Sequence, residues 1–456
     1  MRDLAFIGFI AALLALGLKR PFLFVLAFTY VDIVSPQRLS YYLLNSIPIS
    51  LIAAGLAVGG WLLLDDKKDF RIAPRQWLLL VLLVYCGVAT VNADFPTEAA
   101  AKWDWVWRAL VWAIFLPLTL RTKLRLEAYL LFMTLSAAAI IIVGGMKTAV
   151  SGGGYGSLNL MVDHDSGLYE GSILSTFAIA LIPIILWLAR YGTIFPKDWR
   201  VRIFAACLIF ACLLIPVGTE ARTGLVCIGV MGVLMLRDVK RRFLYLAMVG
   251  AAGLIAVPFL PQSFTARMST IQNYEADASA GTRLAVWGWT WSYVQEHPLG
   301  GGFDSYLGNT LRFTTTATKG EGALAVVSQN VETDQGRAFH SSYFEMLGEH
   351  GFPGIILFLL IHGIGLVRME AVRRRYRKEE GEQEWIAPLA TAMQGAHIIY
   401  LVGSVFVGIA FQPFAYMLVG VQIGFDGYVK RRYPPAKAAG FARKPAEAAL
   451  AAPASA

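Results

Sequence analysis

Three side chains capable of anion binding or acid–base chemistry stand where apolar and polar segments meet: Arg222, Arg283 and His340. Arg222, in GTEARTGLV, begins an apolar run, where a cation is costly unless it faces protein, water or an anion. The alternatives are that Arg222 extends to the lipid headgroups or pairs with Glu220, although residues two apart diverge on a regular helix.

Arg283, in AGTRLAVW, is predicted to begin a helix, with Gly281 and Thr282 as capping residues. A helix N-terminus carries partial positive charge and free N–H groups, so a cation there is locally unfavourable. A bound anion would explain the placement. The alternative is a solvated surface arginine.

His340 lies in FHSSYFEMLGEHGFPG, where we expect another helix to begin. The positive end of that helix and nearby arginines favour a neutral imidazole, which is a competent general base. Pro353, flanked by glycines, predicts a break that leaves 339–350 at the surface and takes 355–366 into lipid. The alternative for His340 is an ordinary hydrogen-bonding residue at the interface.

Other polar residues are weaker candidates. Tyr343, Glu345 and Glu349 follow His340 and are candidates to support it or to contact an acceptor, with a solvated helix face as the alternative. The pair His362 and His397 lies inside apolar segments and is expected to hydrogen-bond across helices.

No metal site and no cofactor are predicted. Asp163–Asp165, DHD, offers ligands for a divalent cation but has no partner cluster. GGGYG, from Gly152, lacks the strand, helix and lysine of a phosphate-binding loop. The cysteines lie in apolar segments without metal-ligand spacing, and His297 precedes a proline at a predicted helix end.

The composition predicts an all-α polytopic membrane protein. The 456 residues are 57% hydrophobic and only 16% charged, whereas soluble domains carry about 25% charged residues. The formal charge of +9 sits in short Lys/Arg clusters between apolar runs. That pattern is typical of cytoplasmic loops and argues against nucleic-acid binding.

Apolar runs predict about 12 or 13 transmembrane helices. The first two are short for a crossing, and a shallow hairpin is the alternative. The predicted spans are 4–18, 21–34, 42–64, 76–92, 106–120, 126–147, 167–189, 200–217, 221–236, 243–260, 339–366, 386–408 and 411–428.

Alternating spans place the Lys/Arg-rich connections on one side, which marks the cytoplasm. No internal repeat is found. The predicted regions are N-terminal transmembrane helices (1–260), a long, partly helical loop on the side opposite the cytoplasm (261–338), C-terminal transmembrane helices (339–428) and a disordered cytoplasmic tail (429–456).

The long loop is predicted to contain a helix lying at the membrane interface. Leu284, Trp287, Trp291 and Val294 have the spacing of one helix face. Tryptophans favour the interface between lipid and water. We expect this helix to cover the outer face of the bundle, and a long ordered loop is usually functional.

The motifs ARTGL, GTRLAVW…HPLGGGFDSY and HSSYFEMLGEHGFPGIILFLL, in this order, resemble the bacterial O-antigen ligase superfamily. This superfamily includes related polymerases and protein O-oligosaccharyltransferases. The resemblance covers about 218–367. The opening MRDLAFIGFIAALLALGLKRPF further resembles the O-glycosylation ligase-like subgroup associated with exosortase gene clusters.

The resemblance implies a glycosyltransferase whose donor is a glycan on undecaprenyl diphosphate, at the periplasmic face of the bacterial inner membrane. Transfer would be metal-independent and inverting. Arg222 and Arg283 would bind the diphosphate, and His340 would deprotonate or orient the acceptor hydroxyl. The acceptor would be a lipid, polysaccharide or protein, and EHGFPG departs from O-antigen ligases proper, so acceptor identity is not inherited.

Three rival functions remain open from the sequence. A polymerase of the same superfamily would use a second lipid-linked glycan as acceptor. A transporter or flippase would usually place ionisable residues near the membrane midplane, whereas these candidates sit at the rim. A structural subunit would have no need of this histidine and these arginines.

Overall fold

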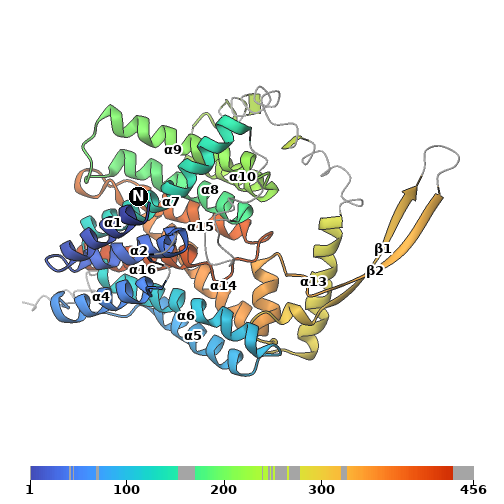
Figure 1. Cartoon of the computed structure of the whole chain (residues 1–456). Coiled ribbons are helices and arrows are strands. Elements are labelled where there is room, and N and C mark those ends of the chain that lie inside the picture. The colour runs from blue at the N-terminus through green and yellow to red at the C-terminus, as the bar shows by residue number, and fades with distance from the viewer. Residues whose placement is uncertain are drawn as a thin grey trace, which may run out of the picture.

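The protein is described by a computed structural model of the whole chain (Figure 1). The residues that it describes are 2–40, 43–44, 46–67, 71–152, 170–238, 240–244, 247, 250–251, 264–265, 278–319 and 326–434.

Helices form nearly all of the described structure. They are α1 (Arg2–Gly17), α2 (Phe22–Val34), α3 (Pro36–Leu39), α4 (Ile49–Leu64), α5 (Pro74–Val91), α6 (Pro96–Thr119), α7 (Lys123–Ser151), α8 (Gly171–Tyr191), α9 (Trp199–Gly218), α10 (Arg222–Met235), α13 (Ala278–Glu296), α14 (Ser342–Tyr376), α15 (Ile386–Gly403) and α16 (Pro413–Arg432), with short 3-10 turns η1 (Leu236–Asp238), η4 (Ser305–Gly308) and η6 (Gly381–Gln383). Two strands, β1 (Thr310–Lys319) and β2 (Val326–Gln335), complete the set.

The predicted all-α membrane fold is confirmed. Every predicted span has a matching helix except 243–260, most of which lies outside the described residues. By length and composition, six described helices can cross a membrane, fewer than the predicted spans, and four shorter helices are apolar. The six are Pro74–Val91, Lys123–Val150, Gly171–Tyr191, Trp199–Gly218, Ser342–Tyr376 and Gly381–Gly403.

The surface of α5 shows why the bundle needs a lipid environment. Its outward side is an apolar stripe at helical spacing, while the opposite side, including Leu79, Leu82 and Cys86, is fully buried. A continuous apolar stripe of this kind marks contact with a membrane. The stripe consists of Trp77, Val81, Val84, Val88 and Val91.

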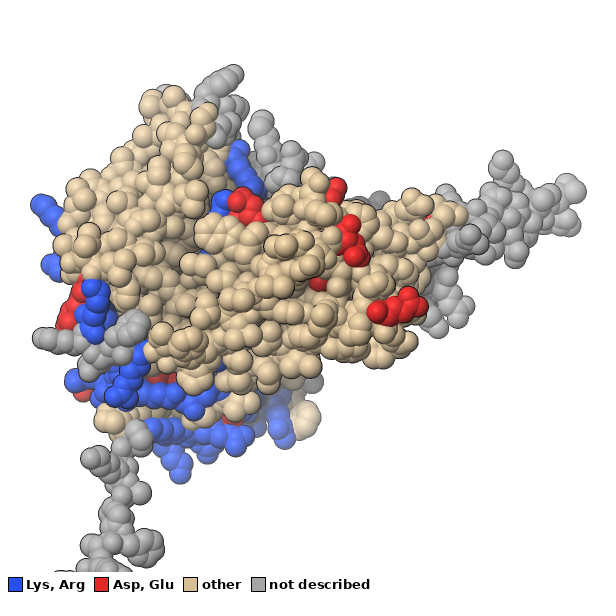
Figure 2. Space-filling view, turned by 90° about the horizontal axis from the view of Figure 1, so that it is seen from below, with Lys and Arg blue, Asp and Glu red and all other residues tan. Residues whose placement is uncertain are grey.

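One end of the bundle, which we call the basic end, holds the Lys/Arg-rich connections that follow α4, α6, α8, α10 and α14. Ion pairs link these connections: Arg125 binds Asp65 at 2.6 Å, and Arg237 binds Glu370 at 2.9 Å. Figure 2 shows blue Lys and Arg atoms gathered toward the left and lower left of one face. The opposite end carries α13, at the right of Figure 1, and we call it the α13 end.

Within the predicted loop, the structure confirms a helix but corrects its details. α13 as described begins at Ala278, so Arg283 lies in the second turn rather than at the N-terminus. Leu284 and Trp291 are more than half exposed, and the buried side instead carries Val286 and Val294. The residues of the predicted single apolar face therefore do not share one environment: Val294 is buried against the protein, whereas Leu284 and Trp291 are exposed.

The same loop contains an antiparallel hairpin of β1 and β2, which the sequence analysis did not predict. Its register runs from Thr310 opposite Gln335 to Lys319 opposite Val326. At the far C-terminus, α16 continues to Arg432, past the predicted boundary at 428. The rest of the predicted tail, 435–456, lies outside the described residues.

Candidate functional site

His340 immediately precedes the N-cap of α14 and is exposed. Its backbone has a φ of 48°, in the left-handed region that side chains other than glycine rarely adopt. Its neighbour Phe339 is only 3% exposed and packs among aromatic side chains of the long loop. Such strain persists only where the surroundings fix it, and it is frequent at functional sites.

The first turn of α14 is held by the connection between α15 and α16. The Ser342 N–H donates to the Ser404 carbonyl at 2.8 Å, and the Ser342 hydroxyl donates to the Val407 carbonyl at 2.9 Å. The Tyr343 hydroxyl donates to the Leu401 carbonyl at 3.0 Å. Tyr343, a predicted supporting residue, therefore anchors α14 to α15. These bonds fix the position of the first turn of α14, which His340 precedes.

Arg283 comes from α13, which is tied to the segment before α14. The Trp287 indole N–H donates to the Phe339 carbonyl at 2.9 Å, and the Trp287 ring stacks on Phe344 with centroids 4.8 Å apart. Arg283 lies one turn before Trp287 and therefore shares its helix face. α13 thus carries Arg283 on the side that contacts the residue next to His340.

Arg222 is the first residue of α10, and its helix reaches the same end of the bundle. The Cys227 thiol lies 3.8 Å from the Ile399 carbonyl of α15, and Arg237 donates to Gln394 at 3.1 Å, so the two helices run antiparallel. Arg222 is five residues, about 7.5 Å, beyond Cys227. That distance brings Arg222 level with the C-terminal end of α15, which holds the start of α14.

The structure therefore brings the three predicted residues, Arg222, Arg283 and His340, to the α13 end from three separate elements. This end lies opposite the Lys/Arg-rich connections. A shared pocket of the three side chains stays a prediction.

Beneath the start of α14 lies a buried charged cluster that the sequence analysis missed. The Lys102 ammonium of α6 donates to Glu345 at 2.8 Å and to Glu349 at 2.7 Å, and it lies 3.5 Å from Asp304. The Glu349 side chain is fully buried. Neither glutamate lies on a solvated face, so that alternative is wrong for both.

Backbone groups complete the charged cluster. The Asp304 N–H donates to Glu349 at 3.0 Å, and the Ala410 N–H donates to Glu345 at 3.0 Å. Burial alone would lower the pKa of the Lys102 ammonium, but the adjacent carboxylates raise it well above its usual value. The cluster joins α6, α14, the segment before η4 and the connection before α16, and so positions the helix that follows His340.

His350, next to Glu349, is enclosed by aromatic rings rather than open to a substrate. Its ring centroid lies 4.7 Å from that of Phe303 and 5.4 Å from that of Phe411. The Tyr85 hydroxyl donates to the His350 carbonyl at 3.0 Å. His350 therefore packs within the core at this end.

The prediction that His362 and His397 hydrogen-bond across helices is confirmed. The Nδ1 of His362 lies 2.7 Å from the Nε2 of His397. The Nδ1 of His397 lies 3.0 Å from Gln422, which also accepts from the buried Arg75 guanidinium at 3.2 Å. This chain joins α14, α15, α16 and α5 inside the bundle.

Among the residues with a described placement, no three His, Cys, Asp or Glu side chains are grouped so as to hold a metal ion. The motif at Asp163–Asp165 and the residues that follow Gly152 lie outside the described residues.

Two sequence families match the chain. Residues 205–359 match the profile of a family described as O-Antigen ligase. Residues 1–193 match a family of unknown function, DUF5935. No curated protein matches the chain. The first match contains Arg222, Arg283 and His340, while Lys102 lies within the second.

Proposed function

We propose that the chain, of which residues 205–359 match the O-Antigen ligase family, transfers a glycan from undecaprenyl diphosphate to an acceptor hydroxyl. We place the reaction at the periplasmic face of the bacterial inner membrane, because the three candidate residues lie opposite the Lys/Arg-rich connections and such connections face the cytoplasm.

The observation that carries the proposal is the bond from Trp287 to the Phe339 carbonyl. It ties the helix that bears Arg283 to the residue beside His340, although these segments are separated by the hairpin. This bond supports the proposal because it holds the segment that bears a cationic group, Arg283, beside the segment that bears the proposed general base, His340. A lipid-anchored donor and a water-borne acceptor meet only at a membrane rim.

The proposed reaction breaks the bond between the sugar anomeric carbon and the diphosphate oxygen. The acceptor oxygen forms the new bond at that carbon from the opposite face, which inverts its configuration. The electron pair of the broken bond goes to undecaprenyl diphosphate, and the acceptor proton goes to His340 and then to water.

Arg222 and Arg283 have the chemistry to stabilise the diphosphate leaving group. Guanidinium groups stay charged at all working pH values and match phosphate oxygens with two parallel N–H donors. Charge fixed near the leaving group stabilises the transition state more than the ground state. General-base assistance by His340 would contribute about 10²–10⁴-fold.

The test uses the full-length protein in lipid nanodiscs with an undecaprenyl-diphosphate-linked glycan, candidate acceptors and a chelator. We expect acceptor-dependent release of undecaprenyl diphosphate, and a fall of about 10²–10⁴-fold in His340→Ala. His297→Ala is the matched control, because His297 is an exposed histidine at the end of α13 and should leave release unchanged. Full activity of His340→Ala would remove the histidine from the mechanism.

The same assay separates a ligase from a polymerase of the same superfamily. A ligase modifies an acceptor that carries no polyprenyl group, whereas a polymerase lengthens a second lipid-linked glycan. We expect the first product. Membership of the exosortase-associated subgroup stays a prediction that the identity of the acceptor will test.

A further inference from the structure

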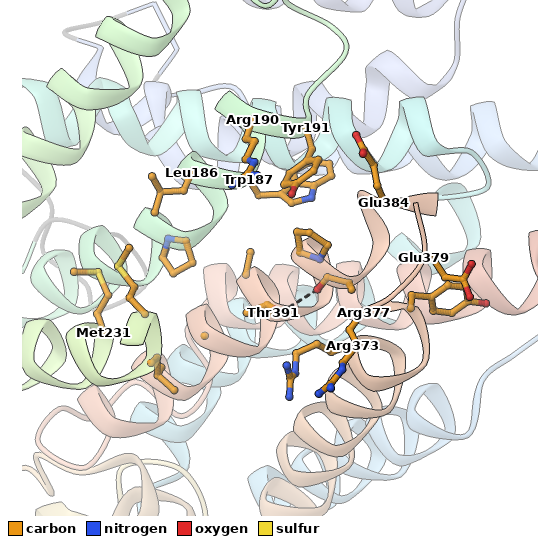
Figure 3. Close-up of a pocket in the computed structure, with 18 of the residues that line it drawn as sticks. Leu186, Trp187, Arg190, Tyr191, Met231, Arg373, Arg377, Glu379, Glu384 and Thr391 are labelled. Atoms are coloured by element: carbon orange, nitrogen blue, oxygen red, sulfur yellow. Dashed lines mark hydrogen bonds between the residues drawn. The ribbon is translucent and has the colours of Figure 1, made fainter. Parts of the chain in front are cut away.

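A cavity of about 800 Å³ lies at the basic end, between α8, α10, the end of α14 and α15 (Figure 3). Its charged residues lie at the basic end, whereas its apolar lining extends along α15 as far as Ile399, five residues before Ser404, which holds the start of α14. Nothing in the proposed glycan transfer uses it, so its occupant is a separate question that does not rest on that function.

The walls of the cavity are apolar. Figure 3 shows Leu186 and Trp187 of α8 facing Met231 of α10, with α15 passing between them and the arginines of α14. Leu186 is 39% exposed, so this apolar wall is open to the surroundings of the bundle. Walls of this kind accept a hydrocarbon chain rather than a soluble ion.

The length of the cavity matches one leaflet of a bilayer. Within α15 its lining runs from Ala387 to Ile399, which is about 18 Å at the helical rise. Half of the hydrocarbon core of a bilayer measures about 15 Å, and half of a bilayer with its headgroup region measures about 20–22 Å. The charged lining residues lie at one end of the cavity and the apolar lining residues along the rest. This order matches the charged headgroup and the apolar acyl chain of a phospholipid.

The mouth carries both signs of charge. Arg190 and Arg377 are exposed there, as are Glu379, Glu380 and Glu384. Figure 3 shows Arg190 on one side of the cavity, Arg377 on the other, and Glu379 and Glu384 toward one end.

Arg373 also lines the mouth, but its guanidinium forms an ion pair with Glu370 at 3.0 Å. Arg190 and Arg377 therefore supply the positive charge for a ligand, and the three glutamates supply the negative charge.

We propose that this cavity binds a phospholipid whose zwitterionic headgroup combines a phosphate with a primary ammonium. Arg190 and Arg377 would contact the phosphate. The glutamates at the mouth would accept hydrogen bonds from the ammonium. An acyl chain would lie along the apolar walls. Purely anionic headgroups and polyprenyl diphosphates fit less well, because the three carboxylates repel them.

The experiment places the full-length protein in nanodiscs that contain equal parts of phosphatidylethanolamine, phosphatidylglycerol and phosphatidylcholine. Native mass spectrometry then identifies lipids that stay bound after release from the disc. We expect enrichment of phosphatidylethanolamine over both others. Phosphatidylcholine tests the primary ammonium, because its quaternary nitrogen has no N–H to donate.

Two sets of variants at the mouth of the cavity test the positive and the negative charges separately. Arg190→Gln with Arg377→Gln should lower bound phosphatidylethanolamine about tenfold or more, as expected for a lost charge-assisted hydrogen bond. Neutralising Glu379, Glu380 and Glu384 together to glutamine should shift the preference to phosphatidylglycerol. Unchanged lipid selection in both sets would overturn the headgroup assignment.

A plug variant tests the cavity itself. Gly395 lines the cavity, and a Cβ there would meet Pro183 at 3.6 Å, an ordinary contact, so the side chain of Gly395→Leu should project into the cavity and narrow it. Gly363→Leu is the matched control, because Gly363 lies in α14 with open space around it. Loss of retained lipid in Gly395→Leu alone supports the site. Equal retention in both variants, or no retained lipid in the unsubstituted protein, contradicts it.

Discussion

At the residue scale, backbone strain gathers beside the candidate residues. Of the four described residues other than glycine that have a positive φ, Glu220, Asp304 and His340 lie here, with φ values of 53°, 58° and 48°, while the fourth, Ser35, lies between α2 and α3. Glu220 stands two residues before Arg222, and Asp304 belongs to the Lys102 cluster. Each conformation costs of order 1–3 kcal/mol and persists where neighbouring contacts hold it. The strained backbone at these positions therefore lowers the stability of the α13 end, and the contacts that hold it fix the direction of the neighbouring side chains.

Arg283→Lys tests whether this arginine grips a diphosphate. Lysine keeps the charge but loses the planar fork that binds two phosphate oxygens at once. We expect kcat/KM for the lipid-linked donor to fall about tenfold or more, the loss of roughly one charge-assisted hydrogen bond. Steady-state kinetics in nanodiscs would measure it. Near-normal turnover would argue against diphosphate binding at this position.

Lys102→Met should destabilise the fold. The methionine removes the Lys102 ammonium and leaves the buried Glu345 and Glu349 beside the partly buried Asp304 without a counter-charge. Breaking a buried ion pair in this way costs about 3–5 kcal/mol. The measurement is the free energy of unfolding in lipid, taken from denaturant titration.

A second substitution distinguishes charge from packing. Adding Glu349→Gln to Lys102→Met removes one uncompensated carboxylate, so part of the lost stability should return. No recovery in the double variant would mean that the aliphatic part of Lys102, not its charge, stabilises this end.

At the element scale, α14 consists of two helical parts separated at Gly351, whose φ and ψ are 58° and −160°. The predicted break at GFPG is thus confirmed, although the non-helical residue is the glycine before Phe352. The Phe352 N–H donates to the Pro298 carbonyl at 3.0 Å, and the Gly301 N–H donates to the Gly348 carbonyl at 3.0 Å. The segment after α13 is therefore bonded to α14 across the break.

Gly351→Ala should be costly, because only glycine populates this backbone region and an added Cβ would collide with Pro298 and Leu299. We expect a loss of at least about 1–3 kcal/mol in the free energy of unfolding. Gly363→Ala, in the same helix with open space around it, should instead add about 0.5–1 kcal/mol. Equal effects of the two substitutions would contradict the role assigned to the break.

Local patterns in the sequence predicted the helices and this break, because apolar runs and a glycine–proline motif act over a few residues. They did not predict the Lys102 cluster, since its partners in α14 are 243 and 247 positions away. The Thr-rich segment of β1 favours a strand, yet its partner β2 was not recognised. The buried side of α13 depends on Phe339, which only the folded chain brings near.

At the scale of the whole molecule, positive charge is divided unequally between the two ends (Figure 2). The basic end contains RDVKRR and VRRRYRKEE, while the α13 end contains the buried cluster of three carboxylates around one ammonium. In the bacterial inner membrane in which we propose the protein to lie, this asymmetry would direct the α13 end outward.

Cysteine labelling in spheroplasts tests this orientation. Glu296→Cys, exposed at the end of α13, should react with a membrane-impermeant maleimide. Lys378→Cys, exposed beyond α14, should react only after the membrane is permeabilised. The unsubstituted protein gives the background from Cys207, which is exposed on α9. The reverse reactivity would invert the proposed topology.

The hairpin of β1 and β2 is closed at its base by the side chain of Asn309, and Leu311 of β1 packs with Val286 and Phe339 beside it. Asn309, fully buried, donates to the Arg337 carbonyl at 2.7 Å and accepts from the Arg337 N–H at 3.0 Å. The Asn309 amide thus joins the two ends of the hairpin, and Leu311 anchors its first strand to the residue beside His340. A change in the length of the strands beyond Leu311 would leave both of these contacts in place, so the projecting part of the hairpin can vary in length without altering the base that holds Phe339.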